Sequence, residues 1–511
     1  MKKIIIIAAV IMAFACTKEK GFFQGDIIRT PVTITATYGS LSTKVNYGES
    51  GSAISATWES DDQIYVIYDG QVSTLSLSSG AGDATATFTG SISHTNPLTA
   101  SSVLACYVKD KNNSSALTIS GGSLVYSDAA FTNQDGTLAS AAKCNIYSGT
   151  TTYGDGTNLS CSFGVSTSMC KFTFKEIGID SGESATVSYM SGDITLASAS
   201  ITVGNGDNLV YLAVPSGSYS GVQKVTYSCA STTNAKNYVL SSSQASFAAG
   251  HTYSKSLMHE FTVSSGGKKV LFAPGNLQYK SGSGWRFAAH QWDYIGVWNT
   301  LDWIDLFGWG TWGTGGNPTN ESTDDAAYTW SSDFSEGTHA GYSDWYTPAG
   351  DEFAWLLGQN TSASSLPGTN CRYSTTVNGT ENARFAMATI NTDETAVAGL
   401  IIFPDNYAGG NPAGVTWDTI NDASKFTTTC TTAGWKALES YGCVFLPASG
   451  YRNADTMYQV GLLGRYFTQT AESDDKAYTL YFTNTKNNRI YPHAGLDKFY
   501  GTAVRLVRNA E

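Results

Sequence analysis

Charged residues and proline are scarce in this sequence, whereas glycine is abundant. Only 14% of the 511 residues are charged, and 11 prolines stand against 52 glycines. The 30 Lys and Arg are outnumbered by 42 Asp and Glu, so the formal net charge is -12. Binding to nucleic acid or to an anionic membrane surface requires clustered Lys and Arg, and no such cluster is present. We therefore expect no nucleic-acid partner.

Catalytic and metal-binding motifs are also lacking. The six His are scattered singly, and no CxxC or HExxH pattern occurs. A catalyst needs an acid, base or nucleophile that converge, and calcium needs several oxygen ligands close together. The motifs of calcium-dependent sugar lectins are absent as well. We expect no catalytic residue, no metal site and no cofactor.

Cysteine usage leaves the redox state open. There are nine Cys, and setting Cys16 aside leaves eight. An even number in an exported chain permits disulfides. Several of them stand in apolar, strand-like contexts, where a small buried thiol explains them equally well.

Long apolar runs are missing except at the start of the chain. Lys2 and Lys3 precede an apolar run over residues 4–15, which is too short to span a bilayer and ends at Cys16. This pattern is typical of a secretory signal. Ala15 before Cys16 resembles a bacterial lipobox, which implies that residues 1–16 are a lipoprotein signal peptide. Cys16 would then be lipidated, residues 17–29 would be a tether, and the protein would be an outer membrane lipoprotein on the cell surface or in a fimbrium.

The sequence that follows is rich in short alternating runs. Residues 32–36, 64–68 and 84–88 alternate apolar and polar side chains between Gly, Asn, Asp and Ser turns. Alternation with a period of two predicts antiparallel strands with one buried face. We expect a mainly β protein.

Residues 30–260 resemble the fimbrillin family of Bacteroidales, which are subunits of surface pili. The pieces that carry the resemblance are residues 44–45, 57–68, 86–90, 211–215 and 247–253. It implies two tandem antiparallel β-sandwich (transthyretin-like) subdomains at 30–160 and 161–262, with Trp58 in a core and Asp62 in a turn. Many such subunits are cut after an Arg so that a donor strand can enter, and Arg29 stands where that proteolytic maturation could occur. Other pilus subunits would then be partners.

A polar segment at 263–269 has the composition of a linker, and the sequence then becomes rich in Trp. We expect most of these Trp to pack in a core or to support loops, because Trp has a large surface to bury. The spacing predicts a short amphipathic helix over residues 350–357 and a second over 435–441. We predict that residues 384–388 and 398–404 form a buried pair of strands.

Residues 270–511 resemble the C-type-lectin-like domains of Bacteroidales surface lipoproteins, which include targets of diversity-generating retroelements. The pieces that carry this resemblance are residues 270–278, 285–288, 305–310, 399–405, 444–452 and 504–508. It implies a mixed α+β ligand-binding domain whose last strands present a binding face, at about residues 464–501. A glycan or protein on a host or bacterial surface would be the partner.

The stretch 442–508 supports that interpretation from its residues alone. It is dense in Tyr, Asn and Arg, which are frequent at recognition surfaces. Ordinary solvated loops would have the same composition, and strand alternation would turn about half of its strand members inward. We expect the ligand contacts among Tyr466, Gln469, Glu472, Asp474, Tyr478, Tyr481, Asn484, Asn487, Arg489, Tyr491, His493, Lys498 and Tyr500.

These observations favour an adhesin that works by binding and not by turnover. A structural pilus subunit without a ligand of its own is the main alternative. The lectin-like fold is also shared with formylglycine-generating enzymes, which rely on a specific pair of Cys. Cys371, Cys430 and Cys443 do not match that arrangement, so we expect no enzyme.

Overall fold

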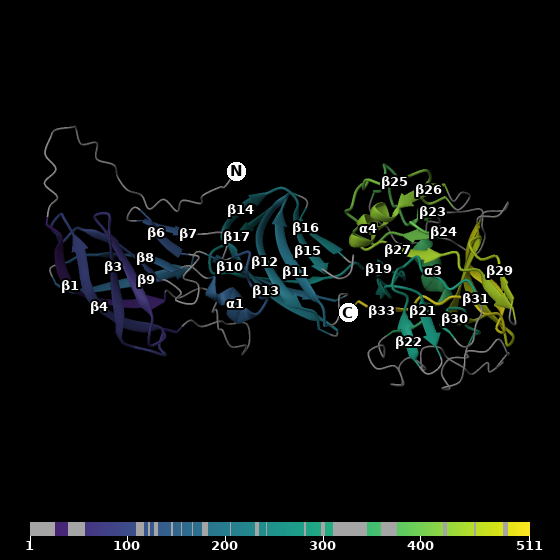
Figure 1. Cartoon of the computed structure of the whole chain (residues 1–511), viewed down its shortest axis with the longest axis horizontal. Helices are drawn as coiled ribbons and strands as arrows, with labels where there is room; N and C mark the ends of the chain where they lie inside the picture. The colour runs from purple at the N-terminus through teal and green to yellow at the C-terminus, as the bar shows by residue number, and fades with distance from the viewer. Residues whose placement is uncertain are drawn as a thin grey trace.

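The computed structural model contains three bodies of mainly β structure that follow one another along the long axis (Figure 1). It describes residues 26–38, 57–108, 117–120, 123–126, 131–144, 147–154, 156–165, 167–175, 182–204, 206–229, 235–241, 243–280, 283–297, 302–309, 345–358, 376–422, 427–453, 456–483 and 489–510. Among these residues, no helix is long and apolar enough to cross a membrane. Cys16 and most of the expected tether lie outside the described residues.

The first domain is a closed barrel of seven strands. In their order around the barrel they are β1 (Ile28–Tyr38), β4 (Thr85–His94), β3 (Gln71–Ser79), β2 (Gln63–Tyr68), β5 (Val103–Val108), β8 (Tyr147–Thr152) and β9 (Asn158–Val165). A separate hairpin comprises β6 (Leu117–Ser120) and β7 (Ser123–Tyr126). Side chains along β1 alternate between the two faces of the strand, and those of Val32, Ile34 and Ala36 point into the barrel core. Trp58 is buried against Tyr38, with ring centroids 4.2 Å apart, which confirms its predicted core role.

The first and last strands of the barrel are parallel neighbours. β1 pairs antiparallel with β4 and parallel with β9, where the register runs from Thr33↔Asn158 to Tyr38↔Phe163. This last pairing closes the barrel, whereas the fimbrillin resemblance led us to expect an antiparallel β-sandwich. The division between the first two domains also differs from the expected residue 160, because β9 continues to Val165. Strand alternation carries no information about which strand edges meet.

The second domain is a two-layered sandwich. One sheet has the order β13 (Asn208–Pro215), β10 (Thr167–Phe174), β18 (Thr252–Leu257), and the other β12 (Ile194–Thr202), β11 (Ser184–Ser191), β15 (Gln223–Cys229), β16 (Ala235–Ser241). A two-stranded ribbon joins β14 (Gly217–Ser220) and β17 (Gln244–Phe247). Phe172 and Tyr189 stack between the sheets, with centroids 6.2 Å apart. The first strand of this domain again lies parallel to its last, since β10 pairs with β18 from Met169↔Thr252 onward.

A segment that precedes β8 packs on the second domain. It contains helix α1 (Leu138–Lys143), which the Thr137 side chain caps. Phe131 is buried in the core of the second domain. The Gln134 side chain donates to the carbonyl of Ala213 at 3.1 Å and accepts from its N–H at 2.8 Å. Residues 131–144 thus fasten the barrel to the sandwich, and buried hydrogen bonds of this kind are costly to break.

The terminal domain combines several small sheets with two helices. Its sheets are β19 (Phe261–Thr262), β20 (Lys269–Phe272), β33 (Val507–Asn509); β21 (Leu277–Lys280), β22 (Gly284–Phe287); β25 (Val415–Thr416), β26 (Thr428–Thr431), β23 (Phe385–Asn391), β24 (Ala396–Ile402), β27 (Val444–Pro447); β28 (Tyr451–Asn453), β29 (Thr456–Tyr458); and β30 (Leu463–Ala471), β31 (Lys476–Thr483), β32 (Arg489–Asp497). The helices are α3 (Gly350–Leu357) and α4 (Thr432–Ser440).

Both short helices and the buried strand pair confirm the sequence-based predictions. In α3, Phe353, Leu356 and Leu357 face the core, and Gly358 ends the helix in the left-handed conformation. The Thr431 side chain caps α4 by accepting a hydrogen bond from Gly434 N at 3.1 Å. β23 and β24 pair antiparallel and are almost fully buried.

The segment 263–269, which we expected to be a linker, instead forms a hairpin turn. β19 pairs with β20 across it, and Val263 N donates to Lys268 O at 2.8 Å. Phe261 and Val263 belong to the core of the terminal domain. The terminal domain therefore starts before the polar segment, because Ser-Gly-Gly composition favours a tight turn as readily as a linker.

Candidate ligand-binding site

The three-stranded sheet β30–β31–β32 lies in the terminal domain, on the side away from the barrel (Figure 1). Arg465 of β30 pairs with Tyr481 of β31, and Tyr481 pairs in turn with Tyr491 of β32. Directly paired residues on neighbouring strands project to the same face of a sheet. The three side chains therefore form a row across one face.

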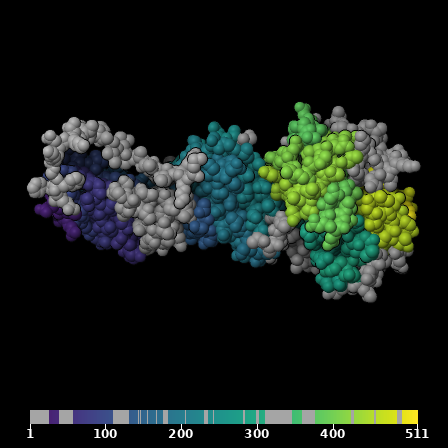
Figure 2. Space-filling model, turned by 45° about the horizontal axis from the view of Figure 1, so that its top comes forward, coloured from purple at the N-terminus to yellow at the C-terminus, as the bar shows by residue number. Residues whose placement is uncertain are grey.

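The hairpin β28–β29 brings further tyrosines to this row. Tyr451 and Tyr458 pair across the hairpin and stack, with ring centroids 5.3 Å apart. Tyr451 also meets Tyr500 edge-on at 5.7 Å. In the space-filling view, this last part of the chain, in yellow, lies at the surface (Figure 2). We call the following residues the tyrosine–arginine cluster: Tyr451, Tyr458, Arg465, Tyr481, Tyr491 and Tyr500.

Aromatic rings surround the guanidinium of Arg465. Its Cζ lies 4.9 Å from the ring centroid of Tyr481 and 5.9 Å from that of Tyr451. Its Nε and Nη1 atoms are buried, and neither has a hydrogen-bond partner among the described residues. Burial lowers the pKa of Arg465, and the neighbouring Tyr481, Tyr451 and Tyr500 partly oppose this effect. The described part of the cluster thus holds a cation whose charge faces π systems in place of a carboxylate.

A buried polar network supports the sheet from its other face. Tyr466 is fully buried, and its hydroxyl donates to Pro447 O at 2.9 Å and accepts from Asn276 Nδ2 at 3.2 Å. Arg505 is also buried and donates to Phe445 O at 2.7 Å and to Asn276 Oδ1 at 3.1 Å. Burial lowers the pKa of Arg505 to about 10. This network fixes the backbone on which the cluster stands.

The expected contact residues are distributed over several environments. Tyr481, Tyr491 and Tyr500 lie in the cluster. Asn484 and Asn487 lie outside the described residues, as does the side chain of Arg489. The other seven are at the ends of the sheet or inside the domain.

Two expected contact residues are buried, and their side chains are not accessible to a ligand here. Tyr466 points to the core opposite the cluster, because neighbours in a strand alternate between faces. Lys498 is 1% exposed, lies over the Trp309 ring at 4.6 Å and donates to Asp474 O at 2.8 Å. Both side chains stabilise the fold.

The remaining expected residues lie at the end of the sheet that α3 approaches. The Tyr478 and His493 rings are 5.1 Å apart, and His493 Nε2 is 3.0 Å from Asp351 Oδ1. Glu472 and Asp474 are exposed in the turn between β30 and β31, as expected for a solvated turn, and Gln469 is half-buried. These side chains border the sheet without joining the cluster.

Sequence reasoning missed Tyr451, Tyr458 and Arg465. Tyr451 and Arg452 belong to the segment 444–452, which carries part of the lectin-like resemblance. Arg452 is fully buried, whereas Tyr451 joins the cluster. For β30, choosing Tyr466 over Arg465 selected the wrong face. Burial of Leu480 and Phe482 with Tyr466 settles the face, but only after the strand register is known.

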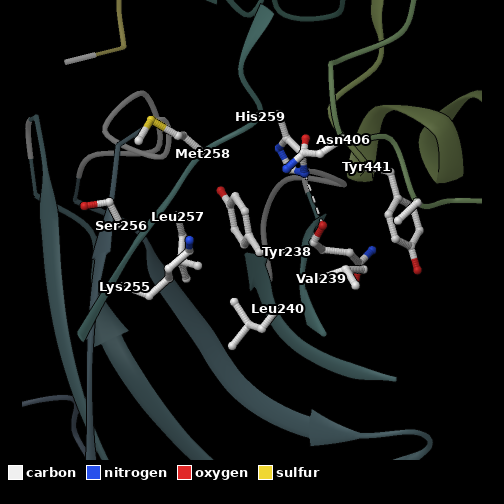
Figure 3. Close-up of a pocket in the computed structure, with 12 residues that line it drawn as sticks. Tyr238, Val239, Leu240, Lys255, Ser256, Leu257, Met258, His259, Asn406 and Tyr441 are labelled. Atoms are coloured by element: carbon white, nitrogen blue, oxygen red, sulfur yellow. Dashed lines mark hydrogen bonds between the residues drawn. The ribbon is translucent and has the colours of Figure 1, made fainter. Parts of the chain in front are cut away.

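A small crevice with a volume of about 40 Å³ lies between the second domain and the terminal domain and is open to solvent. In Figure 3, Lys255 and Tyr238 lie to the left of Tyr441, and His259 and Asn406 are drawn close together at the top. His259 stacks on Tyr238 with centroids 4.7 Å apart and donates through Nε2 to the Asn237 carbonyl at 3.1 Å. Asn237 Nδ2 also donates to Ser440 Oγ of the terminal domain at 2.8 Å, so polar contacts beside the crevice join the two domains.

His, Cys, Asp and Glu side chains are the potential metal ligands of the described residues. No group of three or more His, Cys, Asp and Glu is arranged to hold a metal ion among those residues. Seven cysteines of the described residues are buried and are not joined in disulfides: Cys106, Cys144, Cys161, Cys170, Cys229, Cys430 and Cys443. Burial raises the pKa of Cys170 and of Cys430 to about 12, so neither is a ready nucleophile.

Comparison with known proteins gives distant structural neighbours. No family model and no curated protein matches the sequence. A candidate cell adhesion protein from Bacteroides ovatus matches with a TM-score of 0.28 and 12% identity, over 45% of this chain and 92% of that one. The tip fimbrial protein Mfa3 from Porphyromonas gingivalis, truncated at its C-terminus, matches with a TM-score of 0.23 and 6% identity, over 44% of this chain and 94% of that one. The fimbrial anchor protein Mfa2 of that organism matches with a TM-score of 0.22 and 11% identity, over 39% of this chain and 78% of that one. These similarities are too low to assign a family or a function.

Proposed function

We propose that this chain is a surface-anchored adhesin. In this proposal Cys16 carries the lipid anchor in the outer membrane, the barrel and the sandwich form a stalk, and the terminal domain binds a glycan or protein on another surface. The observation that carries the proposal is the tyrosine–arginine cluster. It gathers five tyrosines and a cation at one face of the last sheet.

The composition of the cluster supports binding. Tyr and Arg are the residues that most often dominate interface energetics, because they combine a large contact area with polar groups. Tyr458 is 40% exposed, and the other tyrosines of the cluster are half-buried. Half-buried rings fixed by their neighbours lose little side-chain entropy when a ligand covers them.

The closed barrel supports a stalk role for the first domain. Arg29 is exposed at the start of β1, opposite Ser93 of β4. A cut after Arg29 would remove only Ile28 and Arg29 from β1, and the pairing with β9 starts at Thr33. Maturation at Arg29 would therefore leave the described barrel circuit in place. Assembly with pilus subunits remains part of the proposal, with this chain at the tip of a fimbrium.

A pair of matched double variants tests the proposal. Tyr481 and Tyr491 form a cross-strand pair in the cluster, and Tyr65 and Tyr107 form one on the barrel. The purified full chain and both Tyr→Ser double variants would be incubated with mucin-coated surfaces and with bacterial cells. We expect saturable binding that weakens at least tenfold in the Tyr481/Tyr491 variant and persists in the Tyr65/Tyr107 variant.

The opposite results would refute specific parts of the proposal. Equal binding by both variants, each shown to be folded by circular dichroism, would remove the cluster as the contact face. Absence of binding by the folded wild-type chain, together with its presence along the whole length of detached fibres, would establish the alternative of a structural pilus subunit.

A further inference from the structure

We infer that Cys106 and Cys161 form a cross-link site of the barrel, where an oxidant joins them in a disulfide that ties β5 to β9 and stabilises the domain. The cross-link lies in the stalk of the proposed function and is independent of the terminal domain and its ligand. The two thiols meet inside the barrel although their strands are not neighbours, since β8 lies between β5 and β9.

Both cysteines point into the core of the barrel. Cys106 is fully buried on β5, and Cys161 is 3% exposed on β9. Cys106 pairs directly with Gly149 of β8, and directly paired residues project to the same face of a sheet. Gly149 therefore faces the core between the two cysteines, on the strand that separates β5 from β9.

The missing side chain of Gly149 leaves the space in which the thiols meet. Residues two strands apart in a sheet are usually roughly 9–10 Å apart, whereas a disulfide needs Cβ atoms about 3.5–4.5 Å apart. A Cβ at Gly149 would lie only 2.9 Å from Cys161 Sγ, so the Cys161 thiol occupies the place of a β8 side chain beside Cys106. β5 and β9 also approach each other directly, with some Cα atoms no more than 8 Å apart.

The two thiols interact with each other. The Cys161 thiol donates to Thr150 O at 3.7 Å and accepts a hydrogen bond from the Cys106 thiol. This hydrogen bond, followed by burial, raises the pKa of Cys106, and the same hydrogen bond lowers the pKa of Cys161. The thiolate is the nucleophile in disulfide chemistry, so Cys161 is the attacking sulfur of the pair.

A small disulfide such as oxidised glutathione serves as the oxidant. The Cys161 thiolate attacks one of its sulfurs, which gives a mixed disulfide and releases one glutathione thiolate. The Cys106 thiolate then attacks Cys161 Sγ and releases the second. The two cysteines lose two electrons to the oxidant, and their two protons end on the two released thiols.

This exchange belongs to folding, because buried thiols are inert. β9 is the last strand of the barrel in the sequence, and its pairing with β1 closes the domain. Cys161 is therefore accessible until that pairing forms. Export, which is part of the proposed function, would place folding in an oxidising compartment.

Refolding of the full chain tests the pairing without any assay of adhesion. The chain is refolded from urea in a mixture of reduced and oxidised glutathione, and free thiols are then alkylated under denaturing conditions. Chymotrypsin can cut at aromatic residues between Cys144, Cys161 and Cys170, which separates these three cysteines. We expect mass spectrometry to find the Cys161 peptide linked to the Cys106 peptide, with Cys144 and Cys170 alkylated.

A thermal measurement tests whether the bond stabilises the barrel. Calorimetry compares the chain refolded in the glutathione mixture with the chain refolded in a phosphine reductant. We expect the reduced barrel to melt roughly 10 °C lower, since a disulfide restricts the unfolded chain. The double variant Cys106→Ala, Cys161→Ala should lack this shift, and the matched control Cys170→Ala should keep it. Each shift is measured within one variant, so any cost of the substitution itself cancels.

The opposite results would overturn the inference. Alkylation of both Cys106 and Cys161 in a folded, oxidatively refolded chain would show that the strands do not allow the bond, and the pair would then be small apolar core residues. A disulfide from either one to a third cysteine would refute the pairing. Equal melting temperatures of the oxidised and reduced wild-type barrel would refute the stabilising role.

Discussion

Asp305 makes the stability of the terminal domain depend on pH in an unusual direction. Its side chain is almost fully buried, and its Oδ2 accepts a hydrogen bond from Ile295 N at 2.8 Å. Burial raises its pKa from 3.8 to about 6, and the hydrogen bond from Ile295 only partly opposes this effect. Each tenfold difference in proton affinity between folded and unfolded states corresponds to about 1.4 kcal/mol, so the difference amounts to about 3 kcal/mol.

The sign follows from which state binds the proton more tightly. Well below the unfolded pKa, Asp305 is protonated in both states and favours neither. Between the two pKa values, the folded chain keeps the proton whereas the unfolded chain releases it. The free energy of unfolding therefore falls by about 3 kcal/mol as the pH rises from roughly 3 to roughly 7, and it levels off above the folded pKa.

Asp305→Asn isolates this contribution because the variant has no carboxyl group to titrate at that position. Every Trp except Trp58 lies in the terminal domain, so urea unfolding followed by Trp fluorescence reports on that domain. We expect the difference in unfolding free energy between variant and wild type to grow in favour of the variant by about 2.5 kcal/mol from roughly pH 4 to pH 7.5. Any constant cost of the Asn amide cancels in this comparison.

Asp302→Asn is the matched control. Asp302 is exposed and pairs with Lys280 at 3.0 Å, and this contact lowers its pKa. Its contribution has the opposite sign, since stability is lost as the pH falls through the lowered pKa. A flat difference between Asp305→Asn and wild type over this pH range would refute the reasoning from burial.

Three further predictions concern other parts of the chain. Thr431→Ala should cost the terminal domain about 1 kcal/mol in urea unfolding, because it removes the cap of α4, and Thr431→Ser should restore most of the loss. At pH 8 only about one in ten thousand of the Cys170 and Cys430 thiols is ionised, so neither should react with DTNB until urea unfolds the chain; rapid labelling of either in the native state would contradict their burial. Cys16→Ser should abolish palmitate labelling in cells, and unchanged labelling would exclude Cys16 as the lipid site.

Local patterns were read correctly where one physical rule was decisive. The 3.6-residue spacing of Phe353 and Leu357 specified α3, and two continuous apolar runs specified β23 and β24. Sequence-based prediction failed where the structure of a segment depends on packing partners that are distant in sequence. The turn at 263–269 depends on Phe261 being buried in the terminal core, which composition cannot reveal.

In the candidate site, too, local composition could be predicted from the sequence, whereas features set by distant partners could not. The sequence stretch that contains it could be named from its Tyr and Arg content, and Tyr481, Tyr491 and Tyr500 were among the expected contacts. Arg465 could not be found because its place among the tyrosine rings depends on which face of β30 it occupies, a property of the folded state. Which side of β30 faces outward depends on the register with β31, and that register is fixed by packing against the rest of the domain.

The parallel placement of first and last strands has a mechanical consequence for a chain held at one end and gripped at the other. A pull that enters at the start of β1 and leaves at the end of β9 acts along both strands in opposite directions. Their interstrand bonds, spread over the six residue pairs from Thr33↔Asn158 to Tyr38↔Phe163, are then loaded together in shear. The six pairs from Met169↔Thr252 to Phe174↔Leu257 place the second domain in the same geometry. Forced unfolding depends on the rate of crossing the unfolding barrier, so two such clamps in series would let the chain transmit tension without extending.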